Sequence, residues 1–457
     1  MINDDTRADL VLRGGSIHVL DAADTRAQAI AVAGGRIVAV GADADIEKRV
    51  GPDTIVVELD GRAVLPGIND SHLHASWLGG MWPDTLFGPG GPREGALVST
   101  DAERREALLK AGDLIASLGI TSYTEPGIGP GEDEGPTGSF GRPVLALYRA
   151  LDAEGLLRAR VNLLLVFGLI DGPARTQDIL DGIRDADTAV RDPERFRIAG
   201  VKIFGDGIPP MRNAYIHGQY EDGSHGALLL DGADDDERET QLRSAISAAH
   251  EAGLQVAVHA TGDRTIDVVV DAVRQAVAQH PADLRHYVVH ADLLPAATAP
   301  LMADAGMGAT IQAGIAAVTS EWAAAATGGP APAPAWPARE LLDAGVPFTL
   351  SSDAPVLPPD WRIEIAAADR LLGPAADPRA RLHELLRRYT AVPAWQDHAE
   401  DWKGTLEVGK VADLVVLSDD PDAVGAQGLP GLHIELTYLG GEVVYDAAAE
   451  PVATGEG

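Results

Sequence analysis

The sequence contains no cysteine, so it can form no disulfide bond and offers no thiolate ligand to a metal ion. It also has no apolar run of about 18 residues, which excludes a predicted transmembrane helix. The first residues are acidic and no apolar segment follows them, unlike a signal peptide. We therefore expect a cytoplasmic protein whose polar chemistry rests on histidine, carboxylates and other non-thiol groups.

Positive charge is scarce as well. The 457 residues carry a formal net charge of −33, and only five of the 36 basic residues are lysine. So acidic a chain argues against nucleic acid or an anionic membrane as a partner. The apolar content of 46% and the charged content of 23% are ordinary for a globular protein. We expect a small-molecule substrate, and a homo-oligomer is compatible with a chain of this size.

Short β-strands are predicted at both ends of the chain. They lie at 10–13, 16–20, 29–32, 36–40 and 54–59, and again at 404–406, 412–417, 435–439 and 442–445. Glycine pairs at 14–15 and 34–35 separate some of them, as expected for hairpin turns. Two β-rich ends around a long middle favour one β-sandwich built from both, although two separate caps would show the same pattern.

The middle of the chain alternates strands with helical segments. Strands are predicted at 63–74, 119–125, 160–168, 200–206, 254–260, 285–291, 306–312 and 347–353. Helices are predicted between them at 101–118, 143–157, 176–191, 237–253, 264–279 and 338–345. Eight βα units predict an α/β fold, a (β/α)8 TIM barrel with its site at the carboxyl ends of the strands. The expected domains are the sandwich parts 1–62 and 400–457 around a barrel at 63–399.

Two histidines one residue apart, His72 and His74, follow the first barrel strand. Side chains alternate faces in extended backbone, so the two imidazoles point the same way. Two imidazoles at one strand end can hold a divalent metal such as zinc. Two unrelated polar contacts would show the same pattern.

Further candidate ligands recur at later strand ends. Lys202 lies among apolar residues, where it either pairs with a carboxylate such as Asp206 or loses its charge and takes up CO2 to become an anionic ligand. His259 and His290 end successive strands, where a lone histidine is usually a core residue but two are better explained as metal ligands. Asp353, after the eighth strand, either caps a loop or binds metal and accepts a proton from water.

Taken together, these segments resemble the amidohydrolase superfamily, and within it the branch of N-substituted formamide deformylase-like metal-dependent hydrolases. The resemblance covers nearly all of the chain and is carried by 65–74, 201–207, 258–264, 352–356 and 404–414. It implies a (β/α)8 barrel with a β-sandwich made from both chain ends. It implies one or two divalent metals, zinc first, held by His72, His74, Lys202 (carboxylated, as a bridge), His259, His290 and Asp353.

The sequence departs from that family at two points. The glutamate usual before the sixth-strand histidine is Val289 here, so a contact to the ligands or the substrate is missing. The chain is also shorter than many members of the branch. Neither departure removes an implied metal ligand.

The implied reaction is the hydrolysis of a carbon–nitrogen bond other than a peptide bond, in a linear amide, formamide or carbamate. A metal-activated hydroxide attacks, Asp353 carries the proton from water to the leaving nitrogen, and His290 also belongs to the catalytic set. A cyclic amide hydrolase or a heteroaromatic deaminase would use the same residues. A relative that binds metal as a non-catalytic scaffold is the alternative of another class.

Substrate contacts are predicted near the barrel mouth. Trp77 and Trp82 follow the first strand, where they suit an apolar group or else pack the loop onto the barrel. The long segment after the fourth strand contains two further candidate contacts. They are Arg212 and Tyr215, and the remaining predicted contacts are His286 and Gln312.

Overall fold

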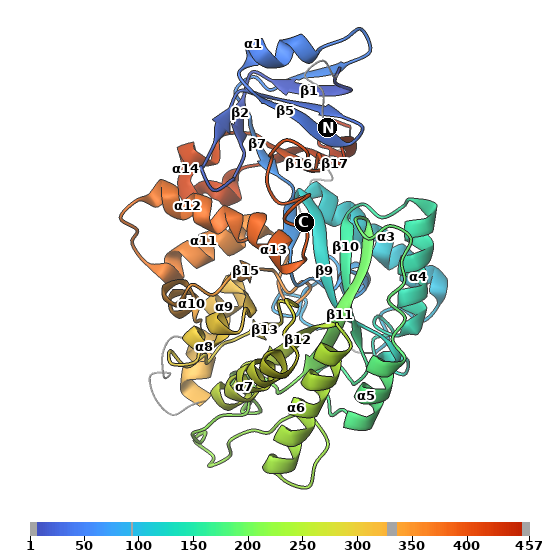
Figure 1. Ribbon diagram of the computed structural model, residues 1–457, viewed down its shortest axis with the longest axis vertical. Coiled ribbons are helices and arrows are strands. Elements are labelled where there is room, and N and C mark those ends of the chain that lie inside the picture. The colour runs from blue at the N-terminus through green and yellow to red at the C-terminus, as the bar shows by residue number, and fades with distance from the viewer. Residues whose placement is uncertain (1–6, 93–94, 327–335, 450–457) are drawn as a thin grey trace.

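An eight-stranded parallel barrel forms the centre of the molecule (Figure 1). The computed structural model describes residues 7–92, 95–326 and 336–449. The strands are hydrogen-bonded in chain order, and a bridge between Leu73 and Ala354 joins the first to the last. They are β8 (Ile68–Asp70), β9 (Ile120–Ile128), β10 (Arg160–Val166), β11 (Phe196–Phe204), β12 (Gln255–Ala260), β13 (Tyr287–His290), β14 (Gly308–Ile311) and β15 (Phe348–Leu350). The predicted TIM barrel is confirmed.

Helices surround the barrel and cover the outer faces of its strands (Figure 1). Local sequence sets their ends: α3 begins at a capping box between Thr100 and Glu103, and α4 ends at the left-handed Gly155. The helices up to the seventh are α2 (Ala75–Met81), α3 (Asp101–Ser117), α4 (Arg142–Glu154), α5 (Thr176–Arg184), α6 (Asp235–Glu251) and α7 (Asp263–Gln279). The later ones are α8 (Ala299–Asp304), α9 (Ala313–Ala326), α10 (Ala338–Ala344), α11 (Trp361–Leu372), α12 (Pro378–Arg387) and α13 (Ala391–Gln396). No helix in the described ranges has both the length and the apolar character needed to cross a membrane.

The barrel strands are apolar on both faces because one face points into the barrel and the other toward the helices. Every residue of β10 and of β12 is buried. Polar residues also lie inside some strands, such as Asn162 of β10 and Thr310 of β14, and the carboxyl ends of the strands form one rim.

Two sheets pack together at one end of the barrel (Figure 1). One has the order β5-β4-β1-β6, and the other has the order β18-β17-β16-β7-β2-β3. A shared apolar core contains Leu12 and Ile30 from the first sheet and Val64 and Val416 from the second. Both chain ends therefore build one β-sandwich, as predicted.

The sandwich strands from the N-terminal part are β1 (Leu10–Arg13), β2 (Ser16–His18), β3 (Arg26–Ala27), β4 (Ala29–Ala33), β5 (Arg36–Gly41), β6 (Ile55–Glu58) and β7 (Ala63–Pro66). Those from the C-terminal part are β16 (Leu414–Leu417), β17 (Ile434–Leu439) and β18 (Glu442–Asp446). A short helix α1 (Asp43–Ile46) and the helix α14 (Pro421–Gly428) accompany them.

The strand predicted over 63–74 is two strands in two different sheets. β7 pairs with β16 and β2 in the sandwich, whereas β8 pairs with β9 in the barrel. The break falls at Gly67, where a Cβ atom would lie 2.0 Å from the Thr121 hydroxyl oxygen. A continuous apolar run can thus serve two sheets when a glycine lets the chain pass close to a neighbouring strand.

One other predicted strand is absent, and one predicted helix is shorter than expected. The segment 404–406 is irregular, although the amide of Leu406 donates to the carbonyl of Val19 at 3.0 Å. Helix α5 ends at Arg184, and the residues up to 191 predicted as its continuation form turns and extended chain.

Candidate metal centre

The structure brings all six predicted ligand residues to the carboxyl ends of the barrel strands. Two follow β8, three lie on β11, β12 and β13 at or near the last residue, and one follows β15. Five of them are buried and one is partly buried. They are His72, His74, Lys202, His259, His290 and Asp353.

Three of these side chains form the tightest group. One ligand atom from each of His72, His290 and Asp353 lies within 4.8 Å of the other two. The Nε2 atom of His72 is 3.2 Å from Asp353 Oδ1, and the Nε2 atom of His74 is 3.5 Å from the same oxygen. Three imidazoles and one carboxylate thus meet around one point, an arrangement that could hold a divalent metal.

Lys202 and His259 complete the cluster on the neighbouring strands. The rings of His259 and His290 have centroids 4.6 Å apart, and the ring of Phe204 stacks on His259 at 5.6 Å. The Lys202 Nζ atom lies 4.8 Å from the centroid of that phenylalanine ring. Among the described residues it has no hydrogen bond or ion pair to a carboxylate. Burial lowers the pKa of Lys202 to about 8.

The predicted alternative, a pair between Lys202 and Asp206, is not formed. The Asp206 carboxylate is buried and accepts hydrogen bonds from the amides of Tyr215 and Gly262, at 3.0 and 2.9 Å, and from the Thr265 hydroxyl at 2.8 Å. These donors satisfy the carboxylate without the lysine. Lys202 therefore lies beside the Phe204 ring and has no carboxylate partner among the described residues.

Burial and nearby charges set the protonation of the histidines. Burial, together with the charge on Lys202, lowers the pKa of His72 to about 3, and burial also holds the pKa of His290 well below its usual range. Both rings are therefore neutral and offer lone pairs. Burial also disfavours the charged form of His74, but its hydrogen bonds to Asp353 and Glu125 outweigh burial and raise its pKa to about 9. The positive charge of protonated His74 balances these two carboxylates. A bound metal cation would balance the same carboxylates in place of that proton.

Each of three histidine rings has an acceptor beside its Nδ1 atom. The Oε1 atom of Glu125 lies 3.4 Å from Nδ1 of His74, and the Oδ1 atom of Asp206 lies 3.5 Å from Nδ1 of His259. The Nδ1 atom of His290 is 2.8 Å from Oε1 of Gln312. Such partners fix the tautomer and leave Nε2 of each ring as the ligand atom.

Glu125 was missed by the sequence reasoning. It is fully buried on β9, and its Oε2 atom accepts hydrogen bonds from the amide of Ala75 at 2.8 Å and from the Tyr148 hydroxyl at 2.7 Å. The signal was present in the sequence, since an acidic residue near the carboxyl end of a barrel strand belongs to the rim where such sites are built.

The backbone at the rim is strained. His290, Ala291 and Asp353 have φ angles of 71°, 58° and 55°, which residues with a side chain rarely adopt. The amide of Asp353 donates to the carbonyl of His72 at 2.9 Å, which fixes the aspartate against the first strand. Strain of this kind persists where the surrounding structure holds it, and it gathers at functional sites.

The donor set fits a divalent metal. The Nδ1 atoms of His72, His74 and His259 are buried without a hydrogen bond from any described residue, and a buried polar atom left unpaired costs about 1–3 kcal/mol. Imidazole nitrogens with a carboxylate are the ligand types of zinc and similar ions. The Nε2 atoms of His72 and His74 converge with His290 on the Asp353 carboxylate, and this group is therefore a candidate metal centre.

The predicted substrate contacts are spread more widely. The ring of Trp77 packs edge-on against His74, with centroids 5.7 Å apart, so it borders the cluster. Trp82 packs on the barrel core, and its carbonyl accepts from Lys110. Arg212 is exposed and lies 3.5 Å from Asp222.

Two of the remaining predicted contacts are tied to other residues. Tyr215 is fully buried, with its hydroxyl 3.2 Å from Glu239. The same glutamate binds Arg264, whose guanidinium covers the tyrosine ring at 4.4 Å. Gln312, besides holding His290, donates to Ser351 at 2.9 Å.

The predicted substrate role of His286 is wrong. His286 precedes β13, whereas His290 ends it, so the two lie at opposite ends of the strand. The Nε2 atom of His286 is 2.8 Å from Nδ1 of His250, and its Nδ1 atom accepts from the amide of Val256. It is a buried structural histidine at the amino end of the barrel, far from the rim.

Val289, where the family usually has glutamate, packs inside the barrel. It is fully buried in a cluster with Leu164, Ala199, Ala257 and Tyr287. This apolar layer leaves no room for a charge on the residue before His290. The missing contact predicted from the sequence is therefore replaced by apolar packing.

Comparison with known proteins agrees with this architecture. A model of the Amidohydrolase family matches residues 90–445. The N-substituted formamide deformylase of Arthrobacter pascens is 24% identical, over 96% of this chain and 98% of that protein. An uncharacterized metal-dependent hydrolase from Pyrococcus furiosus has a similar structure, with a TM-score of 0.71 and 21% identity over 90% of this chain and 99% of that one.

A solved Xaa-Pro dipeptidase with methionine bound in its active site also has this fold, with a TM-score of 0.63 and 16% identity over 96% of this chain and 99% of that one. These solved structures, at such low identity, support the fold alone. The match to the family model extends over most of the barrel and into the C-terminal strands of the sandwich. The chain belongs to the amidohydrolase family.

Proposed function

We propose that this hydrolase cleaves the carbon–nitrogen bond of a small linear amide, formamide or carbamate. The observation that carries the proposal is the convergence of His72, His290 and Asp353 within 4.8 Å beside an unengaged Lys202. The match to a formamide deformylase along nearly the whole chain supports this substrate class over others. The proposed substrate is a small molecule that enters at the barrel rim, and we place the reaction in the cytoplasm.

The proposed metal is zinc, one or two ions per chain. Neutral imidazoles and a carboxylate suit zinc, and the chain has no thiolate to offer. For two ions we propose that Lys202, carboxylated by CO2, bridges them. Its lowered pKa and its lack of a carboxylate partner among the described residues support that role, because the reaction with CO2 needs a neutral amine.

A bound divalent metal lowers the pKa of water to near neutrality and polarises a carbonyl. Asp353 supplies the proton transfer in the proposed reaction: its carboxylate takes the proton of the attacking water and delivers it to the leaving nitrogen. The new carbon–oxygen bond forms as the carbon–nitrogen bond breaks, which yields an acid and an amine. Burial alone would raise the pKa of Asp353, but nearby His72 and His74 hold it well below its usual range, so the carboxylate is ionised.

His290 has the second catalytic role in the proposal. Gln312 binds its Nδ1 atom, so its Nε2 atom remains for the metal and the substrate oxygen. A ligand atom of His290 lies within 4.8 Å of one from Asp353. Trp77, beside His74, is the proposed wall for the apolar part of the substrate.

The test combines metal analysis with a substrate panel. Purified protein is assayed for metal per chain and then with N-substituted formamides, linear amides, carbamates, cyclic amides, aminopurines and Xaa-Pro dipeptides. We expect zinc in the protein and turnover of the first three classes. Turnover of only cyclic amides or aminopurines would shift the function to that alternative, and bound metal with no turnover on any class would favour a scaffold.

A matched pair of variants separates chemistry from folding. Asp353→Asn removes the proton acceptor at the rim, whereas Asp304→Asn makes the same change at an exposed position on α8. We expect the first variant to lose turnover and the second to retain it. Equal turnover in both would contradict the proposed role of Asp353.

A further inference from the structure

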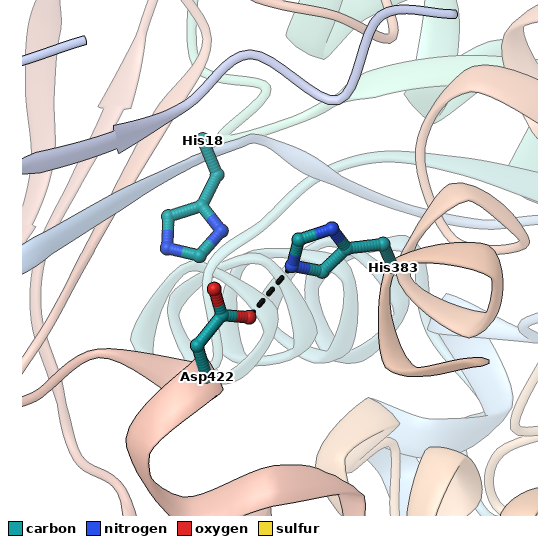
Figure 2. A group of neighbouring side chains, drawn as sticks. All are labelled: His18, His383 and Asp422. Atoms are coloured by element: carbon teal, nitrogen blue, oxygen red, sulfur yellow. Dashed lines mark hydrogen bonds and ion pairs between the residues drawn. The ribbon is translucent and has the colours of Figure 1, made fainter. Parts of the chain in front are cut away.

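A second cluster of metal-ligand side chains lies outside the barrel, where the β-sandwich meets the helices that follow it (Figure 2). His18 ends β2, His383 lies on α12, and Asp422 lies in the first turn of α14. One ligand atom from each is within 4.8 Å of the other two. Both histidine side chains are only 1% exposed, so they are removed from bulk water.

The tautomer of His18 is set by a carboxylate on its far side. Its Nε2 atom is 3.0 Å from Oδ1 of Asp420, and an ionised carboxylate can only accept a hydrogen bond. The proton therefore sits on Nε2, and Nδ1 carries a lone pair. That Nδ1 atom is buried and has no hydrogen-bond partner among the described residues. Figure 2 shows one ring nitrogen of His18 facing His383.

His383 has the same arrangement with its two nitrogens exchanged. Its Nδ1 atom is 2.6 Å from Oδ2 of Asp24, and its Nε2 atom is 2.6 Å from Oδ1 of Asp422. Arg387 binds the other oxygen of Asp24 at 2.6 Å and keeps that carboxylate ionised and in place. A carboxylate thus orients each imidazole from behind, as is usual for histidines that bind a metal.

Asp422 is also held from behind. Its Oδ2 atom binds the guanidinium of Arg26, and the Nε atom of Arg379 is 2.9 Å from the same oxygen. The arginines occupy one oxygen only, so Oδ1 remains directed at the two histidines. Each of the three side chains therefore presents one atom to a common point and has its other atom engaged elsewhere.

We propose that His18 Nδ1, His383 Nε2 and Asp422 Oδ1 bind one divalent transition-metal ion such as zinc, separate from the barrel centre. Two nitrogens and one oxygen are a suitable donor set, and water completes a tetrahedron. Tetrahedral bonds place the donor atoms about 3.3 Å apart, so His383 and Asp422 must separate slightly and His18 must approach them. The other possible occupant is a proton on His383 Nε2, shared with Asp422.

The site would join parts of the chain that are far apart in the sequence. His18 belongs to the sandwich, whereas α12 and α14 lie more than 350 residues later, on the side of the barrel toward the sandwich (Figure 1). A metal ion there ties the two units together and stabilises the folded state in proportion to its binding. The proposed role is structural, with no part in hydrolysis.

The test uses two variants that keep the outer hydrogen bond and remove the ligand atom. In His18→Gln the amide nitrogen can still donate to Asp420, and in His383→Asn it can still donate to Asp24. The exposed His433 provides the matched control, His433→Gln. Each protein is stripped with a chelator, reloaded with zinc, dialysed and analysed for zinc per chain.

We expect both variants to bind one zinc per chain fewer than the wild type and the control. We also expect zinc to raise the melting temperature less in both variants, with hydrolysis unchanged in all of them. Unchanged zinc content in either ligand variant overturns the proposal and assigns the cluster to the shared proton. The proposal also fails if the control variant His433→Gln loses as much zinc as the two ligand variants.

A second background separates this site from the barrel centre. In a His72→Ala/His74→Ala protein, zinc bound at the junction remains when the barrel ligands are removed, and we expect about one zinc per chain. Adding His18→Gln should remove it. If the background protein binds no zinc, the junction proposal fails whatever the barrel centre of the wild type does. If His18→Gln removes one zinc per chain from the background protein, the junction site stands even where the wild type shows no hydrolysis, and unchanged zinc content after His18→Gln overturns the proposal.

Discussion

Replacing Lys202 by methionine should make the metal-free protein more stable while abolishing its function. Methionine has nearly the same length and volume, so the change removes the charge with little repacking. Lys202 is 2% exposed, and its ammonium has no carboxylate partner among the described residues. A charge in such a place is tolerated only because something else requires the residue.

The pKa of Lys202 gives the magnitude. Burial lowers it from 10.5 to about 8, so the folded protein holds the proton less tightly than the unfolded chain. At pH 7 both states are protonated, and the lost affinity costs the folded state about 3 kcal/mol. As the pH rises through 8 toward 10.5, the folded state loses its charge first and the cost disappears. Lys202→Met should therefore add about 3 kcal/mol to the free energy of unfolding at pH 7 and much less near pH 10.

The assay is urea unfolding of metal-free wild type and variant in CO2-free buffer, at pH 7 and near pH 10. Lys48→Met is the control, because Lys48 is 73% exposed and its loss should change stability by less than about 0.5 kcal/mol. A variant that is less stable than the wild type at pH 7 would refute the reasoning, since the ammonium would then have a favourable partner. An equal gain at both pH values would show that the effect comes from the apolar side chain and not from the removed charge.

Three further predictions concern other buried groups. Asp353→Asn should lower kcat by about 10²–10⁴-fold with the fold retained, as measured by steady-state kinetics and circular dichroism, and full turnover would contradict its role as proton acceptor. Glu125→Gln should weaken metal binding about 10–100-fold, because it removes the charge beside Nδ1 of His74. Competition titration with a chelator measures the metal affinity, and an unchanged affinity would contradict this role. Burial raises the pKa of Glu364 to about 8, so the folded state holds this proton more tightly than the unfolded chain and loses stability as the pH rises from about 4.5 through 8. Glu364→Gln should reduce this loss of stability, as measured by urea unfolding at pH 6 and 8.5. An equal loss in wild type and variant between the two pH values would contradict the prediction.

Much of the fold could be predicted from the sequence because burial on both faces makes the barrel strands continuous apolar runs. All eight predicted barrel strands exist, and the six predicted helices exist as well. The predictions fail where one sequence pattern is compatible with two different structures. The run around Gly67 is equally apolar in the sandwich and in the barrel, so only the close approach of Thr121 shows where it divides. Helix α9 was missed within an alanine-rich segment, whereas α11 was missed although the N-cap residue Asp360 marks its start.

The candidate site could be predicted in part for a related reason. Parallel strands end at one rim, so polar residues at successive strand ends must converge even when they are far apart in the sequence. The same logic cannot tell which end of a strand a histidine occupies when the strand is short. His286 precedes β13 and His290, four residues later, ends it, and only the structure assigns the first to a contact with His250 and the second to the rim. Partners such as Glu125 are harder still to predict, because their role depends on the ring that they face.

The same principle explains why the junction cluster gives no signal in the sequence. The barrel ligands follow strands of one repeating unit, so their order along the chain predicts their meeting. His18, His383 and Asp422 belong to a strand and two helices of different units, and no periodicity relates them. What marks them is the buried, unpaired Nδ1 atom of His18, with a carboxylate behind the ring and two further ligand atoms in front. His290 in the barrel shares part of this mark, since Gln312 holds its Nδ1 atom and the residue belongs to the ligand cluster. A lone pair that burial leaves unsatisfied, on a ring whose other nitrogen is already committed, is therefore a more general sign of a metal ligand than any spacing in the sequence.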